Sequence, residues 1–321
     1  YFDIEFYQFL QYKFDVQWKK LKSYANENGI EIIGDIPIYV AMDSADTWSH
    51  PELFQMDEEG RAVAVAGCPP DGFAPDGQLW GNPLYDWGYH KETGFKWWIK
   101  RLRKNFEKYD VIRIDHFRGF DEYYSIPAEE ETAAGGHWEK GPGIELFNKI
   151  KERLGDCKLI AEDLGYVTDS VRQLVNDSGY PGMKVLEFAF DSRDTGNAND
   201  YLPHNYTRNS VVYTGTHDNE TVMGWLDDIT EEEYDKVLAY FNLKKTVKNT
   251  EICDTIIRAA MGSVSDTCII PIQDYLHYDH KYRMNTPSTI GKNWMFRLTE
   301  GEIGEDIWKN IKYLTELYGR G

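Results

Sequence analysis

Short apolar runs alternate with amphipathic stretches along the whole chain. Six runs are dense in Val, Ile and Leu with little polar alternation, which indicates parallel β-strands buried on both faces. They cover residues 31–40, 110–117, 157–163, 183–191, 210–218 and 267–274. Apolar residues also recur at helical spacing before the first two strands, at Leu10, Phe14, Trp18, Leu21 and Ala25 and at Phe95, Trp98, Ile99, Leu102 and Phe106. Thr230 and Glu233 have the spacing of a capping box that opens another helix. The repeated order of strand and helix predicts an α/β fold with a parallel sheet.

Acidic residues end five of the six predicted strands. They are Asp115, Glu162 with Asp163, Asp191, Asp218 and Asp274, and the remaining run carries Asp35. In a (β/α)8 TIM barrel the catalytic groups lie at the carboxyl ends of several strands and face one mouth. We therefore predict such a barrel. Since a barrel needs eight strands, we expect two more upstream of Tyr1.

Two long segments interrupt the alternation, residues 41–90 and 118–142. The first contains GCPPDGFAPDGQLWGNPLYDW, which is rich in Gly, Pro and aromatic residues. Segments of this length without obvious elements are usually lids or binding loops. We predict one partial catalytic barrel domain over residues 1–321, with these two insertions over the active-site mouth.

Composition and charge narrow the class of ligand. The chain has 321 residues, 41% of them hydrophobic, and a formal net charge of −19. Such a surface disfavours nucleic acid and acidic membranes, so a neutral ligand is expected. No apolar run reaches the length of a membrane span and no leader is visible. The four cysteines show no CxxC spacing, which predicts reduced thiols in a cytoplasmic protein.

The stretch VIRIDHFRG carries the first candidate chemistry. Arg113 and Asp115 project to the same side of a strand because side chains alternate. A guanidinium beside a carboxylate favours its ionised form, and an ionised Asp at a barrel mouth could act as a nucleophile. A purely structural ion pair explains this stretch about equally well.

The stretches LIAEDLG and THDNET supply further acids. Glu162 follows an apolar run that would raise its pKa, as a general acid requires. The spacing alone does not show whether Glu162 or Asp163 faces the site. Asp163 could instead cap a helix. Asp218, with His217 beside it, adds a third carboxylate. Several carboxylates suit an oxocarbenium-like transition state, and glycoside cleavage has one.

Other kinds of chemistry receive less support. Trp80, Tyr85 and Trp87 could stack on sugar rings, although for any one of them core packing is the preferred explanation. IDHF and THDN pair His with Asp, but neither HExxH nor paired Cys or His occurs, so no metal is predicted. Nucleotide-binding Gly motifs are missing as well. We predict no cofactor.

Six motifs in order now resemble a known family. GDIPIYVAMDSADTWSHPELF, GQLWGNPLYDW, RIDHFRGF, AEDLG, THDNET and RMNTP are similar to motifs of amylomaltases, or disproportionating enzymes, which are 4-α-glucanotransferases of the α-amylase clan. The resemblance runs from about residue 5 to the end of the chain. It implies a (β/α)8 barrel with inserted subdomains. Because GDIPIYV matches the family's third strand, strands 3 to 8 are expected here.

The resemblance also implies roles for particular residues. Asp115 corresponds to the nucleophile, Glu162 to the general acid/base and Asp218 to the third carboxylate, in a retaining transfer of α-1,4-glucan segments between maltooligosaccharides. The substrate-binding residues implied are Arg113, His217, Asp35, His116, Phe73, Trp80, Asn82 and Asn219. The chain departs from the family in PPDGF, with Gly72 in place of Tyr, and at Ser288, where Gly is common.

Two other functions stay open at this point. The same carboxylates would give an α-glucan hydrolase if water resolved the intermediate. Alternatively, a barrel without its first strands could be a non-catalytic glucan-binding fragment. Missing strands would also leave open sheet edges, through which chains can associate.

Overall fold

A computed structural model describes residues 2–70, 76–165, 167–192 and 200–321. The chain forms two compact units, residues 1–182 and 183–321, here called the N-terminal and C-terminal units. Each of the six apolar runs contains a β-strand of the predicted parallel kind, so the α/β class is confirmed. Among the described residues, no helix combines the length and apolar character that crossing a membrane requires.

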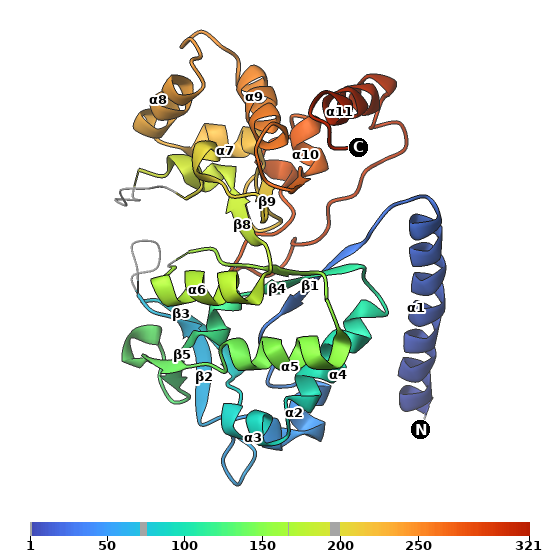
Figure 1. The fold of residues 1–321 in the computed structure, drawn as a ribbon, viewed down its shortest axis with the longest axis vertical. Helices are drawn as coiled ribbons and strands as arrows, with labels where there is room; N and C mark the ends of the chain where they lie inside the picture. The colour runs from blue at the N-terminus through green and yellow to red at the C-terminus, as the bar shows by residue number, and fades with distance from the viewer. Residues whose placement is uncertain (1, 71–75, 166, 193–199) are drawn as a thin grey trace. The chain divides into compact units, whose positions relative to one another are not determined.

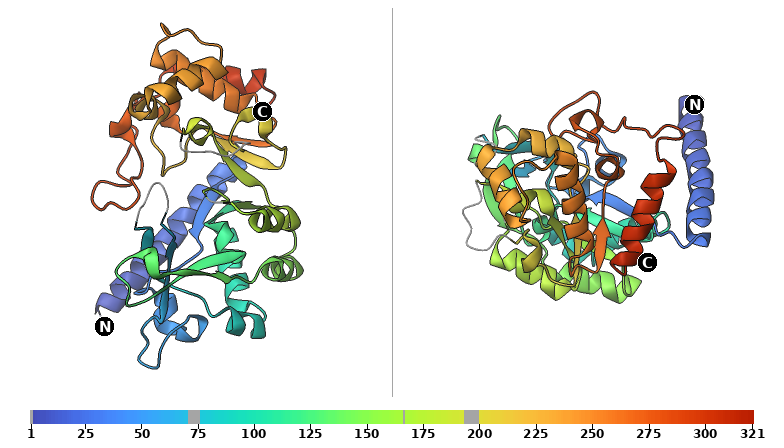
Figure 2. Two further views of the ribbon diagram at one scale, coloured as in Figure 1. Left: turned by 90° about the vertical axis from the view of Figure 1, so that its left-hand side faces the viewer. Right: turned by 90° about the horizontal axis from the view of Figure 1, so that it is seen from above.

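Parallel strands form the centre of the N-terminal unit. Strand β4 (Val111–Asp115) pairs with β1 (Ile33–Pro37) on one side and β7 (Leu159–Ala161) on the other. Gly182, the first residue of β8 (Gly182–Val185), pairs with Ala161. Besides helix α1 (Phe2–Glu27), the helices of the unit are α2 (Ala45–Ser49), α3 (Trp87–Glu92), α4 (Lys96–Phe106), α5 (Ile144–Leu154) and α6 (Asp169–Ser178). Helices α5 and α6 lie side by side (Figures 1 and 2).

The two predicted insertions pair with one another. Strands β2 (Ala64–Cys68) and β3 (Gln78–Pro83) come from the first, and β5 (Glu122–Pro127) and β6 (His137–Lys140) from the second. They form one antiparallel sheet in the order β3-β2-β5-β6. These segments therefore contain the strands of a small sheet as well as the connections between them. Their short runs lack a long apolar stretch because only part of this small sheet is buried.

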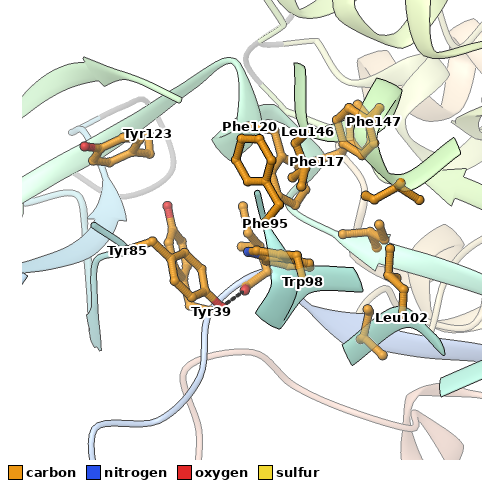
Figure 3. Close-up of a cluster of buried hydrophobic side chains, with 14 of the residues drawn as sticks. Tyr39, Tyr85, Phe95, Trp98, Leu102, Phe117, Phe120, Tyr123, Leu146 and Phe147 are labelled. Atoms are coloured by element: carbon orange, nitrogen blue, oxygen red, sulfur yellow. Dashed lines mark hydrogen bonds between the residues drawn. The ribbon is translucent and has the colours of Figure 1, made fainter. Parts of the chain in front are cut away.

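Aromatic side chains fill the core of the N-terminal unit (Figure 3). Trp98 of α4 is fully buried, and the Phe117 and Phe147 rings stack with centroids 4.8 Å apart. Tyr85 is also buried, and its hydroxyl donates to the carbonyl of Ile38 at 2.7 Å. For Tyr85 the core-packing alternative is therefore confirmed, and stacking on a sugar is wrong.

Helix α1 (Phe2–Glu27) is present as predicted, but its apolar stripe is mostly exposed. Leu10, Phe14 and Leu21 are 43%, 48% and 53% exposed, and only Ala25 of the stripe is buried. The helix stands beside the rest of its unit (Figure 1). It is attached near its C-terminal end, where the Trp18 indole donates to the Lys108 carbonyl at 2.9 Å.

The C-terminal unit has its own parallel strands and helical core. Strands β8, β9 (Ser210–Tyr213) and β10 (Thr267–Ile269) are neighbours in that order. The helices are α7 (Val222–Asp228), α8 (Glu231–Tyr240), α9 (Asn249–Met261), α10 (Ile272–Tyr275) and α11 (Glu305–Leu317). The predicted capping box of Thr230 and Glu233 opens α8.

Two predicted strands are shorter than expected. After Val185 the chain enters a 3-10 turn over Leu186–Phe190, and β10 ends at Ile269. Pro271 has no N–H for a strand ladder and instead precedes helix α10. Asp274 therefore lies in a helix and not at the end of a strand.

Candidate active site

Arg113 joins two carboxylates in the N-terminal unit. Its Nη1 lies 2.8 and 2.7 Å from the two oxygens of Asp35 and 3.0 Å from Oδ1 of Asp115. Strand pairing sets this arrangement, because Asp35 of β1 is in register with Arg113 of β4, and Asp115 lies two residues further along the same face. The predicted Arg113–Asp115 contact is therefore confirmed, and Asp35 is a partner of the same guanidinium.

Burial and charge act in opposite directions on Arg113. Its side chain is only 8% exposed. Burial lowers the pKa of Arg113, but the negative charges of Asp35, Glu162 and Asp115 outweigh that effect and hold the pKa above its ordinary value. The guanidinium is therefore a fixed positive charge that stabilises the carboxylates beside it.

Glu162, just beyond β7, differs from Asp115 in its surroundings. Its Oε2 accepts from the His116 backbone N–H at 2.6 Å and its Oε1 from the Leu164 N–H at 3.0 Å. Burial, followed by the charge of Asp115, raises the pKa of Glu162 to about 7, although Arg113 and the two N–H donors oppose the change. At neutral pH a large fraction of Glu162 is thus protonated.

Asp163 has a separate environment. The next helix, α6, is capped by Thr168, whose hydroxyl accepts from the Val171 N–H. The alternative that Asp163 caps this helix is therefore wrong. Its carboxylate lies against Gly182, where an added Cβ would come within 2.5 Å of Oδ2.

His116 and Trp80 form an aromatic wall near these acids. Their ring centroids are 4.8 Å apart and the rings are nearly perpendicular. His116 has a left-handed backbone, with φ 54, which turns its N–H to Glu162. Burial, reinforced by Arg118, lowers the pKa of His116 to about 3. Its Nε2 is buried and has no hydrogen-bond partner among the described residues.

Two other predicted substrate-binding residues have different outcomes. The Asn82 amide donates to the carbonyl of Val40 at 2.8 Å, so its Nδ2 already has a structural partner. Phe73 and the neighbouring Gly72 lie outside the described residues.

The loop after β9 carries the acid of the C-terminal unit. Asp218 lies beyond the strand, and its Oδ1 accepts from the Asn285 amide at 2.6 Å. His217 Nε2 is 3.3 Å from Asp218 Oδ2. The Asn219 side-chain oxygen folds back to accept from the Thr216 N–H at 2.9 Å and so closes the turn. Asn219 therefore has a local structural role.

Sequence reasoning missed the residues that hold this loop. Arg283 Nη2 donates to the Asp218 carbonyl at 2.6 Å, and its Nη1 is 2.7 Å from Glu220 Oε1. The motif RMNTP contains Arg283 and Asn285, but nothing in its spacing indicates which segment they contact. Ser288 in the same segment has φ 61, a conformation that favours glycine.

Asp274 corrects the expectation that every strand-end acid faces the mouth. It is 1% exposed, and its Oδ2 accepts from the Thr214 hydroxyl at 2.6 Å while its Oδ1 accepts from the Val222 N–H at 2.9 Å. These bonds join both ends of the 214–222 loop. Burial raises the pKa of Asp274 to about 6. Its position is structural.

A metal site is not visible in the described parts of both units. They contain no group of three or more His, Cys, Asp or Glu side chains arranged to hold an ion.

Comparisons with known proteins agree on one family. The sequence profile described as 4-alpha-glucanotransferase matches residues 1–302. The 4-alpha-glucanotransferase of Clostridium butyricum is 47% identical over 320 residues, which cover 99% of this chain and 64% of that protein. The chloroplastic/amyloplastic enzyme of Solanum tuberosum is 43% identical over 313 residues, covering 97% and 53%. This chain thus spans less than two thirds of the length of these relatives.

Solved structures give the same result for the fold. Amylomaltase from Streptococcus agalactiae, in complex with acarbose, has a TM-score of 0.91 and 45% identity and covers 97% of this chain and 62% of its own. Amylomaltase from Corynebacterium glutamicum, at 20% identity and a TM-score of 0.79, supports the fold alone. The fold is of the (β/α)8-barrel type, and the described residues contain six of its parallel strands. The chain belongs to the 4-alpha-glucanotransferase family.

Proposed function

We propose that the protein transfers α-1,4-glucan segments from a maltooligosaccharide or starch-like donor to the 4-hydroxyl of an acceptor glucan or glucose. The observation that carries this proposal is the pair formed by Asp115 and Glu162. Asp115 is ion-paired with a buried guanidinium, whereas burial brings the pKa of Glu162 to about 7. One carboxylate suited to attack beside one suited to proton transfer is the arrangement that retaining glycoside chemistry uses.

The first half of the reaction breaks the glycosidic bond. An oxygen of Asp115 attacks the anomeric carbon, while protonated Glu162 gives its proton to the leaving glucan oxygen. A covalent bond forms between the sugar and Asp115, and the reducing-end fragment departs as a neutral alcohol. Arg113 keeps Asp115 ionised and ready to attack.

The second half forms the new bond. Glu162, now ionised, accepts the proton of the acceptor's 4-hydroxyl as that oxygen attacks the anomeric carbon and releases Asp115. Two inversions return the α configuration. A pKa near neutrality suits Glu162 because the same group must give a proton and then take one.

The remaining residues have supporting roles in this proposal. Asp218 and His217 bind sugar hydroxyls and stabilise the transition state. Asp35 shares the guanidinium of Arg113 close to the substrate, and the rings of His116 and Trp80, which lie against each other, border the same part of the site. We assign Phe73 to the same surface from its motif alone.

The test is an incubation of the chain with maltotriose, resolved by chromatography over time. Glucose together with a ladder of longer maltooligosaccharides, at a constant number of reducing ends, is the expected result. Asp115→Asn is the matched inactive control, because it removes the attacking charge and keeps the shape.

Other outcomes would favour the other candidates. Rising reducing ends with only glucose and maltose would mean that water resolves the intermediate and the protein is a hydrolase. Maltooligosaccharide binding without any turnover would mean a glucan-binding fragment. A sedimentation measurement would show whether chains associate.

Location and partners outside the reaction are part of the same proposal. The four cysteines, which show no CxxC spacing, support a reducing, cytoplasmic compartment. The net charge of −19 supports a neutral ligand and argues against a nucleic-acid partner.

A further inference from the structure

We infer that Arg283 and Glu220 are positioning residues that fix Asp218 for the reaction. This inference rests on the proposed function, in which Asp218 is the third carboxylate. Neither residue is proposed to touch the substrate. Their effect would be on where the Asp218 carboxylate stands and on how firmly it is held.

Asp218 needs such support because it does not belong to a strand. Strand β9 ends at Tyr213, and the next helix, α7, begins at Val222. Asp274 holds the two ends of the intervening loop through Thr214 and Val222. The bond between Thr216 and Asn219 shapes the middle of the loop locally. Joining that part of the loop, where Asp218 lies, to the rest of the unit requires bonds from another segment.

The guanidinium of Arg283 supplies that support with three bonds in different directions. Nη2 donates to the Asp218 carbonyl at 2.6 Å, Nη1 lies 2.7 Å from Glu220 Oε1, and Nε donates to the Asn285 carbonyl at 2.8 Å. A planar fork of donors can make these bonds together, whereas a lysine ammonium is a single point charge. Arg283 therefore connects the loop to the 283–285 segment.

Through its bond to Asn285, Arg283 also influences the position of the Asp218 carboxylate. The Asn285 amide donates to Asp218 Oδ1 at 2.6 Å, and Arg283 fixes the carbonyl of the same residue. One side chain thus orients Asp218 at its backbone directly and at its carboxylate through a neighbour.

Glu220 fixes the arginine in turn. Its side chain is 14% exposed and that of Arg283 is 23% exposed, so the ion pair is only weakly screened by water. Glu220 also has little room to move, because its Oε2 would lie 2.5 Å from a Cβ added at Gly224. The pair is therefore a rigid link between two segments of the C-terminal unit.

The experiment combines an activity measurement with one that does not depend on activity. The full chain would carry Arg283→Ala, Arg283→Lys or Glu220→Gln. Arg297→Ala would be the matched control, since Arg297 is exposed and, among the residues that the structure describes, donates only to the adjacent Phe296 carbonyl. Amide hydrogen exchange is followed on residues 214–222, and kcat and KM are measured with maltotriose.

We expect exchange in 214–222 to rise about 10-fold in Arg283→Ala, with the core strands unchanged. The expected loss in kcat is on the order of 100-fold, with little change in KM, because a small misplacement of a catalytic group has that effect. Arg283→Lys should recover only part of the rate. Added guanidinium ion should restore activity to Arg283→Ala more than ammonium does, which a general loss of folding would not allow.

A double variant tests whether the effect runs through Asp218. If it does, adding Arg283→Ala to Asp218→Asn should cost little more than Asp218→Asn alone. Unchanged exchange in 214–222, or a normal kcat in Arg283→Ala, would overturn the inference. If the unmodified chain lacks transfer activity, the proposed function has failed, and exchange in 214–222 still decides whether Arg283 holds the loop.

Discussion

Asp115 in the N-terminal unit is the last residue of strand β4, whereas Asp218 in the C-terminal unit lies in a loop beyond the end of β9. The first acid is held by neighbours in the same sheet, namely Arg113 on its own strand and, through it, Asp35 on β1. The second is held by Asn285 and Arg283, which are more than sixty positions away along the chain.

This difference shows that two acids found by the same sequence pattern, an apolar run that ends in a carboxylate, can be held in place by different kinds of contact. Both acids follow an apolar run, and both were predicted for the same site. In the sheet, pairing register places the partner automatically. In the loop, the backbone needs separate bonds from another segment, so the position of Asp218 depends on residues that no local pattern identifies.

The largest expected effect compares the two acids directly. Asp115→Asn removes the proposed nucleophile, and we expect transfer from maltotriose to fall by on the order of 10⁴-fold or more. Asp218→Asn removes only transition-state stabilisation and should cost about 10²- to 10³-fold. Initial rates of glucose release measure both.

A matched control for these variants is Asp110→Asn. Asp110 precedes the same strand, but it accepts structural bonds from the Ile32 N–H and from Lys22. This variant should lose stability and keep its rate per folded molecule. Equal losses for Asp115→Asn and Asp218→Asn would contradict the distinction between nucleophile and stabiliser.

The second prediction concerns the pH dependence of the N-terminal site. Because burial raises the pKa of Glu162 to about 7, the acid form persists to neutral pH and is lost above it. We expect the rate of bond cleavage to fall about tenfold per unit well above pH 7. Initial rates of maltotriose cleavage by the unmodified chain, followed from acid to alkaline pH, measure this limb.

A maltosyl fluoride donor sharpens that test, since its leaving group needs no protonation. Formation of the glycosyl-enzyme from it should survive in Glu162→Gln while maltotriose cleavage is lost. An alkaline limb that persists in the variant would assign the titration to another group.

The third prediction concerns stability in the C-terminal unit. Burial raises the pKa of Asp274 to about 6, so the folded state binds this proton more tightly than the unfolded state does. Its stabilising contribution is complete at pH values below about 4 and is lost as pH rises through about 6.

In urea unfolding, the free energy of unfolding of Asp274→Asn should therefore rise relative to that of the unmodified chain by about 2 kcal/mol between pH 4 and pH 7. If the variant also loses a hydrogen bond to Thr214 or Val222, its free energy of unfolding falls by the same amount at pH 4 and at pH 7, so the change between the two pH values stays the same. A constant difference between the two proteins across this range would show that Asp274 does not titrate there.

The smallest expected effect separates structure from binding near the first site. Asn82 donates to the Val40 carbonyl, so Asn82→Ala should lower the free energy of unfolding by about 1 kcal/mol. KM for maltotriose should stay the same. A tenfold rise in KM without loss of stability would instead support the motif-based hypothesis that Asn82 binds substrate.

Several features of the fold were predictable from the sequence. Parallel strands are buried on both faces, so each appears as a dense apolar run, and all six were found. The capping box at Thr230 and Glu233 is a local contact that its spacing alone specifies. The same holds for the contact of Arg113 with Asp115, two residues apart on one strand.

Other expectations failed where distant segments decide the outcome. The stripe on α1 correctly predicted a helix, but burial depends on what packs against that helix, and most of this stripe is exposed. The antiparallel sheet was missed because its strands come from two segments far apart in sequence and are only partly buried.

The α/β class, the family and the acids Asp115, Glu162 and Asp218 were predictable from the chain alone, because strand periodicity and ordered motifs are local properties. Three features became visible in the folded chain: Asp274 is buried and bonds to both ends of the 214–222 loop, Arg283 bonds to Asp218, and burial brings the pKa of Glu162 to about 7. The physical reason is that hydrogen-bond partners, desolvation and charge act through space, between residues that the order of the chain does not bring together.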